Sequence, residues 1–165
     1  MTFFNETEFK LFYLEKFPGL RTYIFAKCND FDFAEDIAQE AFVRLWNNIS
    51  KVEKEKARSF VFTVGNNLFL DHVRHQKVKN NYNSNFVLQQ DNMDPQFLIE
   101  LDEFRKKLED TIQRMPESSR VVFLMNRMEK MTYQEIAQNL QLSVKAIEKR
   151  MQKALEIMAT LKLHK

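Results

Sequence analysis

Residues 132–150 read TYQEIAQNLQLSVKAIEKR, a pattern typical of two short helices joined by a tight connection. Thr132 and Glu135 have the T-x-x-E spacing of a capping box, which opens a helix by pairing with its first backbone N–H groups. Gln141 and Leu142 make the connection, and Ser143 is a second N-cap. The residues expected to face inward are Ile136, Ala137 and Leu140 before the turn, and Val144, Ile147, Met151 and Leu155 after it. This spacing, with a small alanine where the helices would touch, predicts a helix-turn-helix.

The outward face of the second helix carries polar and basic side chains. A helix that reads the major groove needs side chains near its N-terminus to reach base edges, and cations to neutralise phosphates. Base contacts are predicted for Ser143, Lys145, Ala146 and Lys149, and phosphate contacts for Arg150 and Lys153. The alternative is a helical hairpin with a solvated basic face, which this stretch alone leaves open.

A second informative stretch, residues 33–46, reads FAEDIAQEAFVRLW. Asp36, Gln39 and Glu40 project together at i, i+3 and i+4 of a helix. The opposite side packs inward through Ile37, Ala41 and Leu45. We interpret the polar patch as a solvated face or as a protein-docking surface.

Metal chemistry is the other use that paired carboxylates suggest. In a helical bundle it would need Glu-x-x-His motifs on facing helices, and the three histidines, His72, His75 and His164, provide none. The single cysteine, Cys28, can form neither an internal disulfide nor a cysteine-based metal site, and is expected to be a buried, reduced thiol. We therefore expect no metal and no cofactor.

Apolar spacing predicts further helices along the chain. They are expected over about 3–17, 20–27, 32–49, 58–79, 95–115 and 118–128, with Pro18 and Gly19 ending or bending the first. Asp32, followed by Glu35, is expected to cap the third helix, and residues 50–58 to form a charged loop. In the long helix that follows, Phe62, Phe69 and Val73 are expected to face a core. Asp94 and Pro95 are a typical helix start.

Composition supports a helical fold in two parts. Two Gly and three Pro in 165 residues are too few turn formers for an all-β fold. Residues 79–94 read KNNYNSNFVLQQDNMD, a polar stretch without regular periodicity that predicts a flexible linker. We predict an all-α protein with two small helical domains, 1–80 and 95–165, joined by a linker over 81–94, the C-terminal domain being the helix-turn-helix.

The two informative stretches together resemble a known family. AEDIAQEAFxxxW, beginning at Ala34, resembles region two of the bacterial sigma factors, and Met115-Pro-x-x-x-Arg120-x-Val122-Phe through residues 132–150 resembles region four. Their order, spacing and linker are similar to those of the extracytoplasmic function (ECF) group, which keeps only these two domains. The resemblance covers nearly the whole chain.

The resemblance implies a transcription initiation factor whose partners are core RNA polymerase and promoter DNA. Asp36, Gln39 and Glu40 match the positions that dock on the clamp helices of the beta-prime subunit, and the beta subunit is a further expected contact. The residues matched to minus-ten and single-stranded DNA are Lys54, Lys56, Arg58, Asn67, Asp71, Arg74 and Lys77. The helix-turn-helix residues listed above would read the minus-thirty-five element. Proteins of this group are commonly held inactive by an anti-sigma factor, often linked to the membrane.

Two other function classes compete with this interpretation. A dimeric helix-turn-helix regulator would explain the C-terminal half but has no need of the 33–46 helix or the segment after it. An enzyme would need a Gly-rich phosphate loop, a nucleophile elbow or metal-ligand spacing, and the sequence contains none. We expect no small-molecule substrate and no catalysis by this chain. Neither a secretory signal nor a membrane-spanning stretch is found, so we expect a cytoplasmic protein.

Overall fold

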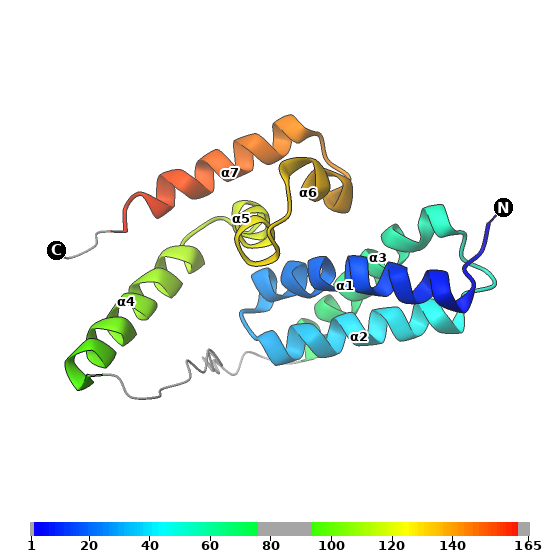
Figure 1. The fold of residues 1–165 in the computed structure, drawn as a ribbon, viewed down its shortest axis with the longest axis horizontal. Helices are drawn as coiled ribbons and strands as arrows, with labels where there is room; N and C mark the ends of the chain where they lie inside the picture. Colours follow the sequence, from blue (N-terminus) through cyan, green and yellow to red (C-terminus); the bar gives the residue numbers. More distant parts are fainter. Residues whose placement is uncertain (1, 76–93, 162–165) are drawn as a thin grey trace. The chain divides into compact units, whose positions relative to one another are not determined.

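A computed structural model describes residues 2–75 and 94–161, and within these ranges all regular structure is helical. The helices are α1 (Glu6–Cys28), α2 (Phe31–Asn47), α3 (Lys54–His75), α4 (Pro95–Gln113), α5 (Glu117–Glu129), α6 (Tyr133–Leu140) and α7 (Val144–Met158) (Figure 1). The all-α prediction is confirmed. The predicted linker, 81–94, lies outside the described residues except for Asp94. The chain divides into two compact units, Met1–Ser84 with Met128–Lys130 and Asn85–Arg127 with Met131–Lys165.

A two-residue turn joins α1 to α2. Asn29 takes a left-handed backbone conformation, with φ of 55°, and ends α1 through a bond from its backbone N–H to the Phe25 carbonyl. Asp30 is then extended, and its carboxylate accepts the backbone N–H of Phe33 at 3.1 Å. The predicted cap at Asp32 was therefore wrong by two residues, because the chain turns as soon as α1 ends.

The core between α1 and α2 is aromatic. The ring of Phe42 lies between 5.1 and 6.5 Å from the rings of Phe9, Phe12, Tyr13 and Phe17 on α1. Phe42 is 2% exposed, so the four rings of one helix close over a single ring of the other. Edge and tilted ring contacts of this kind add to the hydrophobic gain from burial.

Pro18 does not break the first helix, contrary to our expectation that Pro18 and Gly19 would end or bend it. The helix runs through both residues from Glu6 to Cys28. Proline removes one backbone hydrogen bond, but Phe17, Leu20 and Ile24 on either side are all buried in the core. Tertiary burial of a continuous face outweighs the local cost.

Helix α3 begins about one turn before residue 58, where the sequence predicted its start. Residues 54–58 belong to α3 instead of a charged loop, so Lys54, Lys56 and Arg58 lie on a helix. At Gly65, an added Cβ would lie 3.2 Å from Cδ1 of Leu20, which shows how closely α3 approaches α1. Val73, expected in the core, is 50% exposed. It lies on the part of α3 after Gly65, the last residue of that helix that is buried.

The second unit confirms three predicted helix starts. Asp94 caps α4 through the backbone N–H of Gln96, Thr132 and Glu135 form the capping box of α6, and Ser143 caps α7 through the backbone N–H of Ala146. Its fully buried side chains include Val122, Met125, Ile136, Ile147 and Met151.

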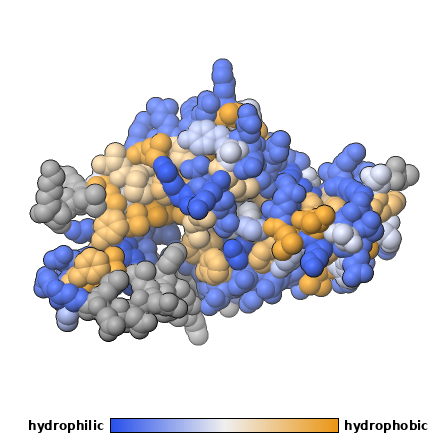
Figure 2. All heavy atoms as spheres, in the orientation of Figure 1, coloured by the Kyte–Doolittle hydropathy of each residue, from blue (hydrophilic) through white to orange (hydrophobic). Residues whose placement is uncertain are grey.

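Two residues predicted to face inward on α7, Val144 and Leu155, are instead 38% and 40% exposed, because Ile147, Met151 and Ala154 form the buried side of the helix. Apolar side chains are also exposed on α4, where Phe97 is 49% and Phe104 38% accessible; Figure 2 shows apolar side chains at the surface over this helix.

Candidate nucleic-acid and protein interfaces

The outer face of α2 presents the polar patch predicted from the sequence. Asp36, Gln39 and Glu40 are all exposed, while Ile37, Ala41 and Leu45 are buried on the opposite side. The carboxylate of Glu40 accepts a hydrogen bond from Nε of Arg44, 3.2 Å away, and both side chains are half-exposed. The patch is therefore an accessible acidic surface on one side of α2.

The start of α3 is held by the N-terminal residues. The backbone N–H of Lys54 donates to the carbonyl of Thr2 at 2.9 Å, and its ammonium lies 2.7 Å from Oε1 of Glu8. Glu8 also closes a capping box with Asn5, its Oε2 accepting the Asn5 backbone N–H at 2.9 Å. The bonds to Asn5, and secondly to Lys54, lower the pKa of the Glu8 carboxyl. We call these contacts the N-terminal clasp.

The residues predicted to contact minus-ten DNA fall on two sides of α3. Lys56, Asn67, Asp71 and Arg74 are exposed and recur at intervals of 11, 4 and 3 residues, which places them on one face. Arg74 lies 3.8 Å from Asp71, so part of its charge is offset within this face. Lys77 lies outside the described residues.

Lys54 and Arg58 lie on a different side of α3, toward α1. Lys54 contacts Glu8, and the guanidinium of Arg58 lies 5.4 Å from the ring centroid of Phe62. Burial lowers the pKa of Arg58, which remains a cation at any physiological pH because its ordinary value is so high. The structure thus separates these two cations from the outer face.

The helix-turn-helix is closed by short local hydrogen bonds. Gln141 takes a left-handed conformation, with φ of 55°, and the backbone N–H of Leu142 donates to the Ala137 carbonyl at 3.0 Å. The buried Asn139 donates to the Glu135 carbonyl at 2.8 Å. The bond from Leu142 closes the turn between α6 and α7, while the bond from Asn139 lies within α6.

Three lysines form one row on α7. Lys145, Lys149 and Lys153 are exposed at i, i+4 and i+8. Ser143, whose hydroxyl is the N-cap, is exposed, and Ala146 and Arg150 are half-buried beside the row. All six predicted minus-thirty-five residues therefore lie on the N-terminal cap and the accessible side of one helix, a geometry suited to the major groove.

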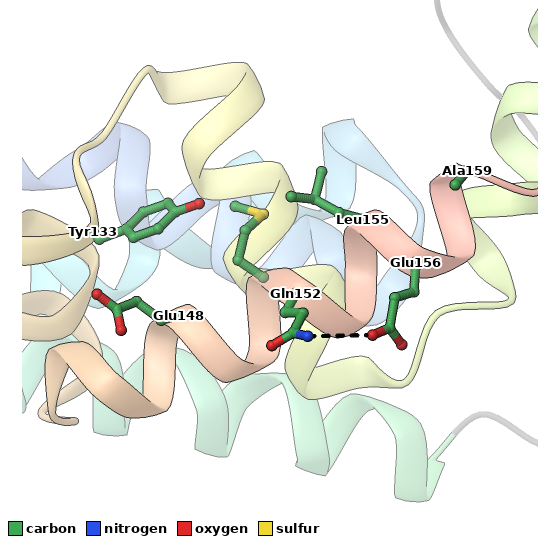
Figure 3. A pocket seen from close by; sticks show the side chains of 7 residues that line it. Tyr133, Glu148, Gln152, Leu155, Glu156 and Ala159 are labelled. Carbon is green, nitrogen blue, oxygen red and sulfur yellow. Dashed lines mark hydrogen bonds between the residues drawn. The ribbon is translucent and has the colours of Figure 1, made fainter.

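A shallow pocket of about 440 Å³ lies on another side of α7. Figure 3 shows Tyr133, Glu148, Gln152, Leu155, Glu156 and Ala159 around it, with Met151 also in its wall. Nε2 of Gln152 donates to Glu156 at 3.5 Å. Two carboxylates at its edge disfavour a phosphate there, so the basic row and not the pocket side is suited to DNA.

Family comparison decides between the function classes. Residues 13–78 match Sigma-70 region 2, and residues 105–158 match Sigma-70, region 4. The chain belongs to the sigma-70 family. With these two regions in this order it is an ECF sigma factor, which confirms the predicted family: it binds core RNA polymerase and promoter DNA and directs transcription initiation. Sigma factors are non-catalytic subunits of the polymerase.

Two solved structures share the fold of this sigma factor. CnrH, in complex with the cytosolic domain of CnrY, aligns with a TM-score of 0.57 at 21% identity over 95% of this chain and 88% of that one. The sigma factor RpoE from Bartonella quintana, in complex with the anti-sigma factor NepR, aligns with a TM-score of 0.57 at 18% identity over 94% of this chain and 99% of that one. No curated protein sequence matches the chain significantly. Within the described ranges, no helix of the sigma factor is long and apolar enough to cross a bilayer.

Sequence reasoning missed residues that belong to the sigma factor's surfaces. Val43 is 50% exposed on α2, three residues after Glu40 and seven after Asp36, so it lies within the acidic face. Helical periodicity is the signal that places it on this face. Glu8, which pairs with Lys54, gave no sequence signal because 46 residues separate the partners.

Proposed function

We propose that the acidic face of α2 is where this sigma factor docks on core polymerase, through Asp36, Gln39, Glu40 and the apolar Val43. The observation that supports this most directly is that all four are accessible on one side of a helix whose other side is buried. An apolar centre with charged neighbours suits a protein interface, since the valine gains by burial and the charges select the partner. The clamp helices of beta-prime are the proposed partner, with the beta subunit as a further contact.

We propose that promoter DNA is recognised by two surfaces. The outer face of α3, with Lys56, Asn67, Asp71 and Arg74, would hold the minus-ten region. Lys54, which the N-terminal clasp holds at the start of α3, and Arg58 would contact the same region from the side of α3 that lies toward α1. The surface of α7 from Ser143 to Lys153 would read the minus-thirty-five element. Cations along exposed helices support phosphate contacts, and an accessible helix N-terminus supports base contacts.

We also propose a role for each part of the chain, a partner that controls it and the compartment in which it acts. We assign 1–80 to polymerase docking and minus-ten recognition, 81–94 to the linker, and 95–165 to minus-thirty-five recognition. Both aligned structures are complexes, one of them with an anti-sigma factor, and we propose that an anti-sigma factor likewise controls this chain. The protein would act in the cytoplasm and leave catalysis to core polymerase.

Reconstitution with bacterial core polymerase tests the proposal. We expect co-elution with core and discrete start sites when genomic fragments are transcribed. Binding to DNA without core, together with failure to form a complex with core, would favour an independent dimeric regulator. A matched pair of variants, Glu40→Lys on the acidic face and Glu15→Lys on α1, separates the proposed docking face from a general effect of charge.

A further inference from the structure

Helix α4 carries an apolar stripe that is buried only near one end. Phe97, Leu101, Phe104 and Leu108 recur at intervals of 4, 3 and 4 residues, a spacing that keeps side chains on one side of a helix. Among the described residues of this helix, the buried one is Thr111, near its C-terminal end. Phe97 is 49% and Phe104 38% exposed, and Leu101 and Leu108 are half-buried. We call the four residues from Phe97 to Leu108 the α4 stripe.

Two opposite charges flank the α4 stripe along one edge. Glu100 and Lys107 are both exposed and lie seven residues apart, which is about two turns, so they project from the same side of the helix. Oε1 of Glu100 accepts a hydrogen bond from the neutral amide of Gln96 at 3.2 Å. This edge is therefore negative toward the N-terminus of α4 and positive toward its C-terminus.

A second copy of α4, running antiparallel to the first, complements the apolar side chains. In the register centred between residues 102 and 103, Phe97 would lie opposite Leu108 of the second copy, and Leu101 opposite Phe104. Every layer then pairs a phenylalanine with a leucine, as the side chains of two packed helices interdigitate. Because the two copies use the same surface, two-fold symmetry repeats each of these pairs.

The same antiparallel arrangement pairs unlike charges. Residues on the same edge of the stripe face one another in such a pair, so Glu100 of one copy would face Lys107 of the other, twice by symmetry. The ends of α4 near the buried Thr111 would lie at opposite ends of the paired helices. A parallel pair would instead bring these two covered ends together, so the antiparallel orientation is the one that suits both charge and packing.

We propose that the free sigma factor forms a two-fold symmetric dimer in which the α4 stripes of two copies pack antiparallel. Self-association of the free chain is separate from the binding of polymerase and promoter DNA proposed above. Burial of Phe97 and Phe104 from each copy supplies the apolar gain, and the pairs between Glu100 and Lys107 select the orientation. The stripe spans only about three helical turns, so the interface is small and the dissociation constant should lie in the micromolar range.

Sedimentation velocity of the full chain over a concentration series measures this association. We expect the average mass to rise with concentration from that of one chain toward that of two. Phe104→Glu should raise the dissociation constant by at least about tenfold, because it places a charge at the centre of an apolar interface. Ile99→Glu is the matched control, since Ile99 is 56% exposed and lies about half a turn away from the stripe. It should leave the dissociation constant unchanged, and circular dichroism checks that both variants keep their helices.

Charge reversals test the partner and the orientation. Glu100→Lys and Lys107→Glu should each weaken association, because each places like charges opposite one another in both symmetric pairs. The double variant exchanges the two charges and should restore association. An equimolar mixture of the two single variants should form a mixed dimer, since one chain then has only positive and the other only negative charges at these two positions.

Three results would overturn the dimer. The first is a chain that stays monomeric at every concentration, and the second is a dimer that Ile99→Glu weakens as much as Phe104→Glu. The third is a dimer that neither charge reversal weakens, because its copies would then meet through another surface or in another orientation. Failure of the proposed function is a different observation, the absence of binding to core polymerase and promoter DNA.

Discussion

The ammonium of Lys54 lies 2.7 Å from the carboxylate of Glu8, which joins the first turn of α1 to the first turn of α3 across 46 residues of sequence. Because Thr2 also accepts the Lys54 backbone N–H, the N-terminal segment holds the point where α3 begins. A residue that resemblance assigns to DNA thus has a structural partner as well, and the two roles can be separated by experiment.

The N-terminal clasp should make stability depend on pH. The folded-state pKa of Glu8 is lowered by Asn5 and then by Lys54, so its stabilising contribution is present above the ordinary glutamate pKa, about 4.3. It is lost as pH falls through the lowered value. We expect Glu8→Gln to lower the thermal midpoint slightly at neutral pH and not at all in strong acid. Thermal unfolding followed by circular dichroism, with Glu15→Gln as the control, checks this; an equal difference at every pH would contradict it.

Charge reversal on the acidic face should prevent association with core polymerase. We expect Asp36→Lys with Glu40→Lys to weaken core binding by well over tenfold, since like charges at an interface cost several kcal/mol. The Glu40–Arg44 pair is exposed, so its loss should change the free energy of unfolding by less than about 1 kcal/mol. Competition for core against the wild type measures the first quantity and denaturant unfolding the second. Unchanged core affinity would remove the docking assignment.

The lysine row of α7 should set the salt dependence of promoter binding. Replacing Lys145 and Lys149 with Ala should lower the slope of log affinity against log salt by about 2 if both contact phosphates. If either reads a base, discrimination at that base pair should relax by roughly 1–3 kcal/mol. Binding of the reconstituted holoenzyme to duplex promoter DNA over a salt series gives both. Lys106→Ala with Lys107→Ala on α4 makes the same charge change and should have little effect; equal losses from the two pairs would point to general electrostatics.

Gly65 should not tolerate a side chain. Alanine would gain about 1 kcal/mol in helix propensity, but its Cβ would lie 3.2 Å from a methyl group of the fully buried Leu20. Overpacking of this kind costs about 1–3 kcal/mol, so we expect Gly65→Ala to be destabilising by roughly 1 kcal/mol. Denaturant unfolding checks the sign, and a stabilised variant would show that Leu20 can repack.

What the sequence predicted well is local. The caps at Asp94, Thr132 and Ser143 depend on residues within one helical turn, and the exposed patch on α2 depends only on helical periodicity. These features are readable because each is decided by neighbours three or four residues away.

What the sequence could not show depends on contacts between distant residues. Pro18 remains inside α1 because the flanking residues are buried by other helices. The Lys27–Asn66 bond joins partners 39 residues apart, and no local pattern marks either residue. The start of α3 was misplaced for a related reason, since Lys54 is held there by Thr2 and Glu8.

The aromatic packing of α1 against α2 also has an optical consequence. Trp46 is the only tryptophan of the chain, and its ring lies 4.9 Å from that of Phe9. Its fluorescence therefore reports the loosening of α1 from α2 alone, whereas the far-ultraviolet circular dichroism of the protein sums over all its helices. Unfolding curves from the two signals would coincide if both units melt in one cooperative step and diverge if each melts by itself. A single unlabelled sample would thus reveal whether the halves of this sigma factor share their stability.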